Sequence, residues 1–497
     1  MRIAVVASEA APFSKTGGLA DVTGALFREY EKLGHVVYLF VPLYRVTKER
    51  VGSRLRPMGA EFEVPLGREN ALCTVYALEP ETESAGGAGT VFLIGNDRFF
   101  DRDGLYGTAA EDYGDNDRRF AFFCKGVAET CRRLNLAPDI LHCHDWQTAL
   151  IPLYLKTLYR DDPLFSRTKT VFTIHNLGYQ GHFPALSMEV TGLGWDLFRP
   201  EGIEFYGKVN FLKAGLIGAD VLTTVSETYA EEILTPEFGF GLDGLLRKRS
   251  DALFGIVDGI DYTEWDPSSD GFLPETYRVA DLTGKSRCKK ELMRRCGLKG
   301  KPSSPLLCFI GRLAEQKGIG LLSEVLPDAI GAGALFVVIG TGEQRYVGLL
   351  GTYAAEFPGK MYFHDKFDEP LAHLAYAGSD IFLMPSLYEP CGLGQMIAMR
   401  YGSVPVARKT GGSADTISHV GHIEDYVCEG LFGDTDGTGF LFADHSGESF
   451  GREIRRAMCL CRSGGPWKRL MRNGMSRDFS WERSAQQYLK LYERAAT

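Results

Sequence analysis

The stretch Lys15-Thr-Gly-Gly-Leu-Ala-Asp-Val22 nearly recurs as Lys409-Thr-Gly-Gly-Ser-Ala-Asp-Thr416, far along the same chain. Each copy follows a short apolar run, Ile3–Ala7 or Val404–Ala407, and leads into a stretch of helical character. Paired glycines after a strand allow a turn with positive φ and direct successive N–H groups to one point. A helix that begins there adds a partial positive charge, which suits a phosphate or a sugar hydroxyl. Two copies, each opening its own α/β unit, therefore predict two similar domains that bind one polar, phosphorylated ligand.

Composition limits the classes of function. The 497 residues include 44% hydrophobic and 24% charged side chains, as is usual for a globular protein. A net charge of −9 argues against a nucleic-acid partner. No apolar run approaches the roughly 18 residues of a membrane span, and the first residues lack the apolar region of a signal peptide. The 11 cysteines are scattered, and Cys459-x-Cys461 has no second pair. We therefore expect a cytoplasmic, reduced protein without zinc or membrane attachment.

Two sets of short apolar runs, bounded by turn residues, predict parallel strands in doubly wound sheets. The first set is Ile3–Ala7, Val36–Val41, Val91–Ile94, Ile140–His142, Val171–Ile174 and Val221–Val225. The second set is Leu306–Ile310, Ala334–Ile339, Met361–His364, Ile381–Met384 and Val404–Ala407. Helices are expected over Arg118–Leu134 and Tyr206–Ile217, and a polar surface loop over Glu79–Thr90.

The pattern places the domain boundary near Gly255. We expect an N-terminal Rossmann-like domain over residues 1–254 and a C-terminal nucleotide-sugar domain over residues 255–474. Residues 475–497 follow, and Ser476–Arg494 has the apolar stripe of an amphipathic helix. Such a terminal helix needs a surface on which to bury its stripe.

Two strand-to-helix connections carry the strongest chemical signals in the second half. In Cys308-Phe-Ile-Gly-Arg-Leu-Ala-Glu-Gln-Lys-Gly318, Arg312 and Lys317 follow a strand, at the edge where open α/β sheets bind ligands. Arginine offers a planar fork to phosphate oxygens, and lysine adds a mobile charge. In Met384-Pro-Ser-Leu-Tyr-Glu-Pro-Cys-Gly-Leu-Gly-Gln395, Glu389 precedes a helix expected to begin near Gly392. Glu389 repels phosphate but can accept hydrogen bonds from sugar hydroxyls.

The first half places polar residues in corresponding positions. His175 and Asn176 come just after a strand, and Asp145 ends another. The string His142-Cys-His144 has the spacing of a metal site, but no third ligand stands nearby, so no metal is expected.

Together these strings resemble glycosyltransferase family 5, the bacterial glycogen synthases and plant starch synthases of the ADP-glucose type. The resemblance covers nearly the whole chain, in family order, through KTGGLADV, HCHDWQTAL, TIHNLGYQG, EFYGKVNFLKAGL, TTVSETYAEEIL, IGRLAEQKG, PSLYEPCGLGQ, RKTGGSADTI, DGTGFLF and FSWERSAQQYLKLY.

The resemblance implies a glycosyltransferase-B fold, with two Rossmann-like domains facing a deep cleft and a C-terminal helix that returns to the N-terminal domain. It implies retaining transfer of glucose from ADP-glucose to the non-reducing end of an α-1,4-glucan, glycogen or a maltooligosaccharide, without a metal or other cofactor. Oligomeric state is not indicated.

Roles for individual residues follow from motif position in the resemblance. Lys15 would contact the donor diphosphate from a loop shaped by Gly17 and Gly18, and Arg312 and Lys317 would hold the leaving diphosphate. Glu389, with the backbone of Cys391, Gly392 and Leu393, would hold the glucose and adjoining phosphate. His175 would contact the transferred glucose, while Asp145 and Asp21 would order the cleft. Further candidates for the site are Thr410, Tyr106, Asn176 and Asp258.

The chain departs from the family pattern at two positions. Asp258 stands where most members have asparagine, and Gly394 stands where most have threonine. A second glutamate, which related retaining transferases carry eight residues after the first, is Ile397 here. Front-face attack is therefore favoured over a covalent glucosyl-enzyme. Alternatives are an enzyme of this fold that uses UDP-glucose or forms a small oligosaccharide, and a catalytically idle glucan-binding protein.

Overall fold

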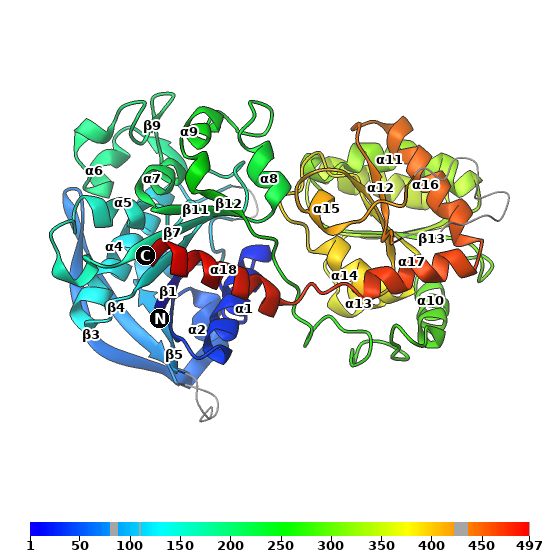
Figure 1. The fold of residues 1–497 in the computed structure, drawn as a ribbon, viewed down its shortest axis with the longest axis horizontal. Coiled ribbons are helices and arrows are strands. Elements are labelled where there is room, and N and C mark those ends of the chain that lie inside the picture. Colours follow the sequence, from blue (N-terminus) through cyan, green and yellow to red (C-terminus); the bar gives the residue numbers. More distant parts are fainter. Residues whose placement is uncertain (80–87, 109–110, 422–435, 497) are drawn as a thin grey trace. The chain divides into compact units, whose positions relative to one another are not determined.

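The computed structural model describes residues 1–79, 88–108, 111–421 and 436–496. The chain forms two compact units (Figure 1). Unit 1 contains Met1–Val225, Ala230–Ile256 and Trp481–Thr497, and unit 2 contains Ser226–Tyr229 and Val257–Ser480. The functional domain limits inferred above, at residues 254/255 and 474/475, stay a prediction.

Unit 1 is built on a nine-stranded sheet of order β12-β11-β7-β6-β1-β2-β5-β4-β3. Its strands are β1 (Arg2–Val6), β2 (Val36–Pro42), β3 (Leu55–Leu66), β4 (Glu69–Leu78), β5 (Ala88–Gly95), β6 (Ile140–His144), β7 (Lys169–Ile174), β11 (Val221–Thr224) and β12 (Leu253–Gly255). The strands from β12 to β5 are parallel, whereas β4 pairs antiparallel with β3 and β5. The continuous apolar runs are explained by burial on both faces, as in β1, where Ile3 to Val6 are fully buried.

Helices cover this sheet and a small antiparallel sheet lies beside it. The helices are α1 (Gly18–Lys32), α2 (Arg45–Val51), α3 (Asp97–Phe100), α4 (Asn116–Leu134), α5 (Leu150–Lys156), α6 (Ser187–Thr191), α7 (Phe211–Gly218) and α9 (Asp243–Lys248). A further helix, α8 (Glu227–Glu232), begins in unit 2 and ends in unit 1. The small sheet has the order β8-β10-β9, formed by His182–Pro184, Lys208–Asn210 and Glu204–Phe205.

The last helix, α18 (Trp481–Ala496), belongs to unit 1 and packs on α1 (Figure 1). Its buried stripe includes Trp481, Tyr488 and Tyr492, and the Tyr492 hydroxyl lies 2.8 Å from that of Tyr30 on α1. The expected return of the C-terminal helix to the N-terminal domain is confirmed.

Unit 2 is a doubly wound parallel sheet of order β15-β14-β13-β16-β17-β18. The strands are β13 (Leu306–Ile310), β14 (Leu335–Ile339), β15 (Met361–His364), β16 (Ile381–Met384), β17 (Val404–Arg408) and β18 (Phe440–Phe442). The helices are α10 (Thr283–Arg295), α11 (Ile319–Gly331), α12 (Gln344–Glu356), α13 (Glu369–Gly378), α14 (Gly394–Arg400), α15 (Gly411–Thr416), α16 (Gly447–Cys461) and α17 (Gly465–Met475). Contacts join α10 to α13 and α11 to α16, as expected for helices on the two faces of the sheet.

The predicted strands coincide with observed strands within one or two residues at most ends, and the expected two-domain glycosyltransferase-B architecture is confirmed.

One helix prediction was partly wrong. Residues 206–210 form the turn and strand of a hairpin, and α7 begins only at Phe211, capped by the Asn210 side chain. The predicted loop Glu79–Thr90 lies mostly outside the described residues, and its last residues begin β5.

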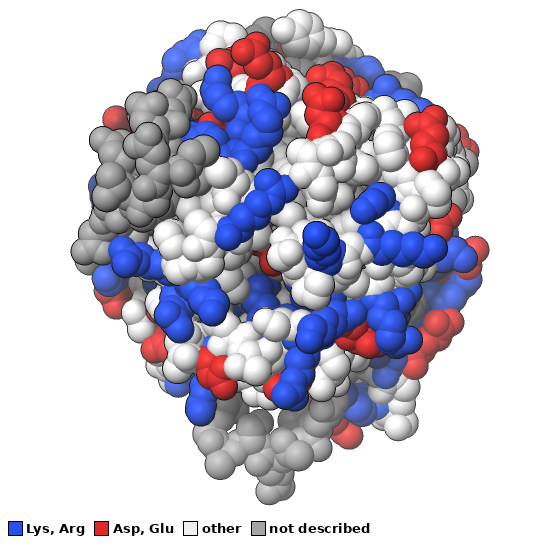
Figure 2. All heavy atoms as spheres, turned by 90° about the vertical axis from the view of Figure 1, so that its right-hand side faces the viewer, with Lys and Arg blue, Asp and Glu red and all other residues white. Residues whose placement is uncertain are grey.

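Among the described residues, we find no helix with both the length and the apolar character needed to cross a bilayer. One face of the surface is rich in basic side chains. Figure 2 looks onto unit 2 and shows many Lys and Arg side chains, with fewer Asp and Glu between them. Exposed basic residues of α10 and α17, such as Arg294 and Lys468, belong to this unit.

Candidate active site

The predicted site residues lie in loops that follow the strands at the topological switch point of each sheet, where the strand order reverses. In unit 1, β1 lies between β2 and β6, and in unit 2, β13 lies between β14 and β16. Loops after such neighbouring strands leave a crevice at the carboxyl edge, where open α/β sheets bind ligands. Lys15 and Asp145 follow β1 and β6, whereas Arg312 and Glu389 follow β13 and β16. Each unit therefore carries predicted residues at its own ligand-binding edge.

The first Lys-Thr-Gly-Gly loop is open and exposed. Lys15 forms a 2.7 Å ion pair with Asp21, in the first turn of α1, and remains about half exposed. Gly17 has φ −157°, so the positive φ expected for this pair of glycines is wrong at Gly17. A Cβ there would meet no atom within 4 Å, which leaves room for a ligand against the backbone.

Glu9, which the sequence analysis did not single out, holds this loop in place. Its buried carboxylate accepts hydrogen bonds from the backbone N–H of Thr16 and from the Thr16 hydroxyl at 3.0 Å. Burial raises the pKa of Glu9 to about 6, against the opposing effect of the Thr16 hydrogen bonds. The available signal was an acidic residue three positions after a buried strand.

Tyr106 lies beside Glu9. Its hydroxyl is 2.7 Å from the Ser8 hydroxyl, and it also interacts with the Glu9 carboxylate. Burial, followed by the charge of Glu9, raises the pKa of Tyr106 well above its ordinary value. Tyr106 is therefore a neutral hydrogen-bonding group at the edge predicted for the donor.

Asp145 is held in a strained conformation at the end of β6. Its φ is +57°, in the left-handed region that non-glycine residues seldom adopt. The carboxylate accepts a hydrogen bond of 2.8 Å from the backbone N–H of His175 and another from that of Asn176. Burial nevertheless raises its pKa to about 7. The structure thus brings Asp145, His175 and Asn176 together, although thirty residues separate the two motifs.

Three histidines form a chain behind this point, with His142 and His144 buried and His175 partly exposed. His175 Nε2 lies 3.0 Å from His144 Nδ1, and the rings of His144 and His142 have centroids 4.0 Å apart and planes inclined by 39°. His142 bonds to Thr173 through Nε2 and to Tyr492 through Nδ1, so both of its ring nitrogens are occupied. Burial lowers the pKa of His142 and of His175 to about 3, which keeps both rings neutral at physiological pH.

In unit 2, Lys317 and Glu389 form the centre of the predicted site. Lys317 Nζ lies 2.6 Å from a Glu389 oxygen, and the Ser386 hydroxyl donates to the same oxygen at 2.9 Å. The turn after Lys317 requires glycine, because Gly318 has φ +69° and a Cβ would overlap the Pro385 carbonyl. Arg312 lies in the same loop, with Nη2 3.5 Å from the Gln316 amide oxygen.

The second Lys-Thr-Gly-Gly loop is buried rather than open. Gly411 has φ +42°, and a Cβ at Gly411 or Gly412 would overlap the carbonyl oxygens of Glu389 and Cys391. The N–H of Gly412 donates to the Glu389 carbonyl at 3.1 Å. Thr410 is itself only 2% exposed. This loop therefore supports the Glu389–Cys391 backbone, and its Gly412 N–H is not directed at a ligand as the sequence suggested.

Packing explains the family departure at Gly394, where α14 begins. A Cβ at Gly394 would lie 3.0 Å from the Phe382 ring, so the ring occupies the space that a side chain would need. Gly392, two residues earlier, has φ +75°, and Leu393 precedes the first helical residue. The helix begins slightly later than predicted.

Asp258 is buried beside the same segment. It contacts the Cys391 thiol, whose pKa is raised first by burial and then by the charge of Asp258. The aspartate at this position therefore faces the Glu389–Leu393 turn.

Comparison with known proteins agrees with this arrangement. Residues 2–248 match the starch synthase catalytic domain model, and residues 297–460 match the model of glycosyl transferases group 1. The glycogen synthase of Thermodesulfovibrio yellowstonii is 44% identical, with 99% of this chain and 97% of the relative covered. Glycogen synthase 2 of Geobacter sulfurreducens is 45% identical, with 100% and 99% covered.

Two solved structures are similar to this chain in fold. The catalytic domain of starch synthase IV from Arabidopsis thaliana, bound to ADP and acarbose, superposes with a TM-score of 0.87 at 33% identity, over 100% of this chain and 99% of that one. Sucrose-phosphate synthase from Thermosynechococcus elongatus shares the fold, with a TM-score of 0.58 at 16% identity over 99% of this chain and 98% of that one. With full-length relatives at this level of identity, the chain belongs to the glycogen synthase family.

Proposed function

We propose that this protein is a glycogen synthase that transfers glucose from ADP-glucose to the non-reducing end of an α-1,4-glucan, with retention and without a metal in the reaction. One observation carries the proposal: cationic and hydrogen-bonding side chains stand at the winding reversal of each sheet, in a chain whose full-length relatives are glycogen synthases. The ADP and acarbose held by the starch synthase IV structure support a nucleotide donor and a glucan acceptor.

In the proposed reaction, the bond between glucose C1 and the β-phosphate oxygen breaks, and a new bond forms from C1 to O4 of the acceptor. Negative charge grows on the departing ADP, so preorganised cations at the diphosphate stabilise the transition state. We assign this role to Lys15, Arg312 and Lys317. The carboxylate of Glu389, held by Lys317 and Ser386, accepts hydrogen bonds from the sugar.

The acceptor proton passes, in this proposal, to the departing phosphate. His175 is neutral at working pH because burial lowers its pKa to about 3, so it orients the sugar through hydrogen bonds without supplying a proton. Ile397 occupies the position of a second carboxylate in related transferases. Trapping of a glucosyl adduct on Glu389 would overturn front-face attack in favour of a covalent intermediate.

The test is a donor panel. Radiolabelled ADP-, UDP- and GDP-glucose are supplied separately to the purified chain with glycogen, and incorporation is followed. We expect incorporation from ADP-glucose. Preference for UDP-glucose would support the alternative donor, and no incorporation from any donor would support an idle glucan-binding protein.

Variants test the residue assignment separately. Arg312→Ala and Lys317→Ala should each lose on the order of 10²–10³ in kcat, the typical effect of removing one transition-state donor. Lys290→Ala, at an exposed position on α10, serves as the control and should keep normal turnover. Near-normal kcat in Arg312→Ala or Lys317→Ala would refute the assigned role while leaving the donor result intact.

A further inference from the structure

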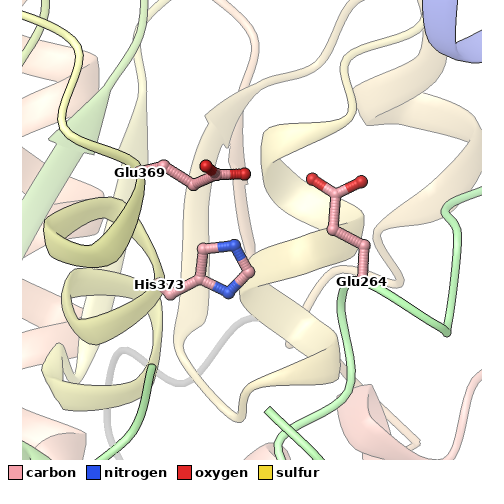
Figure 3. Close-up of side chains that lie close together, drawn as sticks. All are labelled: Glu264, Glu369 and His373. Atoms are coloured by element: carbon pink, nitrogen blue, oxygen red, sulfur yellow. The ribbon is translucent and has the colours of Figure 1, made fainter. Parts of the chain in front are cut away.

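A second cluster of ligating side chains lies in unit 2, on elements other than the loops after β13 and β16. Glu264, Glu369 and His373 each offer one ligating atom, and these atoms lie within 4.8 Å of one another (Figure 3). Glu369 and His373 are four residues apart on α13, so they project from the same side of the helix. Glu264 comes from the segment that follows the passage of the chain into unit 2.

The Trp265 ring fixes Glu264 beside the helix. It stacks on the His373 ring with centroids 4.0 Å apart and planes inclined by 10°. The backbone N–H of Trp265 donates to the Asp261 carbonyl at 2.8 Å, which holds the turn that carries Glu264. Both glutamates are exposed, whereas His373 is 1% exposed.

Hydrogen bonds define which nitrogen of the His373 ring carries the hydrogen. Nδ1 lies 2.8 Å from Asp270, and the Tyr401 hydroxyl donates to the same carboxylate oxygen at 2.6 Å. The Asp270 oxygen accepts from both groups, so Nδ1 carries the hydrogen and the Nε2 lone pair is available.

The other ring nitrogen of His373, Nε2, is buried and has no hydrogen-bond partner among the described residues. In Figure 3, one ring nitrogen faces the two carboxylates, and Nδ1 is the nitrogen engaged by Asp270. A buried ring nitrogen without a hydrogen-bond partner is costly. A cation between Nε2 and the carboxylates would satisfy it.

Arginine side chains pair with the aspartates that stand close to the two glutamates in the sequence. The start of α13 favours the negative charge of Glu369 through the helix dipole. Arg295 pairs with Asp368 at 3.1 Å and Arg400 pairs with Asp266 at 2.5 Å. The neighbouring guanidinium groups are thus engaged by the aspartates that flank the cluster.

We propose that Glu264, Glu369 and Nε2 of His373 bind a divalent transition-metal ion of the Zn²⁺ type, with Asp270 orienting the imidazole. One imidazole with two carboxylates suits zinc and similar ions, whereas Mg²⁺ and Ca²⁺ prefer oxygen alone. A carboxylate on the other ring nitrogen is the usual partner of a metal-bound histidine. With bonds of about 2.1 Å, tetrahedral ligands lie about 3.4 Å apart, so the exposed glutamates need to move by about 1 Å.

The bound ion has a structural consequence. The N–H of Ile260, four residues before Glu264, donates at 2.8 Å to the carbonyl of Phe479, just before the chain leaves unit 2. An ion between Glu264 and α13 therefore fastens the entering segment to the body of unit 2. This role is independent of the glucosyl-transfer proposal.

The experiment uses the full chain, freed of metal by a chelator and titrated with Zn²⁺ by calorimetry and with Co²⁺ by visible absorption. We expect one equivalent to bind, with Co²⁺ d–d bands and without the near-ultraviolet charge-transfer band of thiolate ligands. Excess Mg²⁺ should not compete. Glu264→Gln and Glu369→Gln should each bind at least tenfold more weakly, because each loses an anionic ligand at an exposed position that tolerates the amide.

Glu356→Gln, at an exposed position at the end of α12, is the matched control and should bind as the wild type does. The melting temperature should rise with Zn²⁺ in the wild type and in the control, and not in the two ligand variants. Equal affinity in all four proteins, a thiolate band, or no saturable binding would overturn the proposal.

Discussion

Replacing Asp145 by asparagine should stabilise the protein at and above neutral pH. The carboxyl pKa is raised from its ordinary value of 3.8 to about 7, chiefly by burial. The folded state therefore favours the protonated form, and the ionised form opposes folding. Asparagine resembles the protonated acid in shape, keeps an oxygen for the His175 N–H, and tolerates the left-handed φ of +57°.

The size of the effect follows from the pKa shift. Stability is full below the ordinary pKa and is lost as pH rises from about 4 to 7, because the folded state holds a proton that the unfolded state releases. The full shift corresponds to about 4 kcal/mol. The Asp145 side chain is only half-buried, and water that reaches it screens part of this cost, so we expect about 2 kcal/mol.

Urea unfolding of wild type and Asp145→Asn, followed by tryptophan fluorescence near pH 4 and pH 8, measures the difference. The two proteins should be nearly equal at the lower pH, and the variant should be more stable at the higher one. The variant should also lose glucosyl-transfer activity, as expected if strain at a functional residue is retained at the expense of stability. A gain independent of pH, or destabilisation at pH 8, would refute the reasoning.

Three further predictions concern packing and charge. Gly412→Ala should lower the free energy of unfolding of unit 2 by about 2–4 kcal/mol in a urea titration, because the new Cβ would overlap the Cys391 carbonyl and the backbone there cannot move aside. The control Gly348→Ala, in open space on α12, should leave that free energy unchanged or raise it. Tyr492→Phe should cost about 1–3 kcal/mol by removing bonds to Tyr30 and His142, and an unchanged thermal melt would contradict this. Glu389→Gln should cost about 1–3 kcal/mol by leaving partly exposed Lys317 unpaired, and a double-mutant cycle with Lys317→Met should recover part of the loss.

The core of the fold was readable from the sequence because parallel strands buried on both faces appear as unbroken apolar runs. The β3–β4 hairpin was missed because it lacks such an unbroken run. One face of β3 is exposed, and residues such as Glu61 and Glu63 interrupt its apolar pattern. Strand ends located Asp145 and Arg312 at ligand-binding edges. Their partners could not be read, because the contact of Asp145 with His175 depends on β6 pairing with β7.

Glu9 and the Glu264–His373 cluster show a second limit. Glu9 belongs to no motif that the sequence presents, and its role appears only when the loop folds back to place Thr16 against it. Glu264 and His373 are separated by more than a hundred residues and meet through the stacking of Trp265. Side chains that act through long-range packing leave no periodic or spacing signal in one sequence.

The two Lys-Thr-Gly-Gly loops also show that sequence repetition does not imply equal roles. Both follow a parallel strand and start a helix, which the shared architecture requires. In the first, Gly17 lies open and Lys15 extends to solvent, so a ligand can approach the backbone. In the second, the glycines are pressed on the backbone of Glu389 and Cys391, so the loop fixes the carboxylate that holds Lys317. The repeat is thus explained by the shared strand-to-helix architecture, in which one loop is open to solvent and the other packs on the backbone of Glu389 and Cys391.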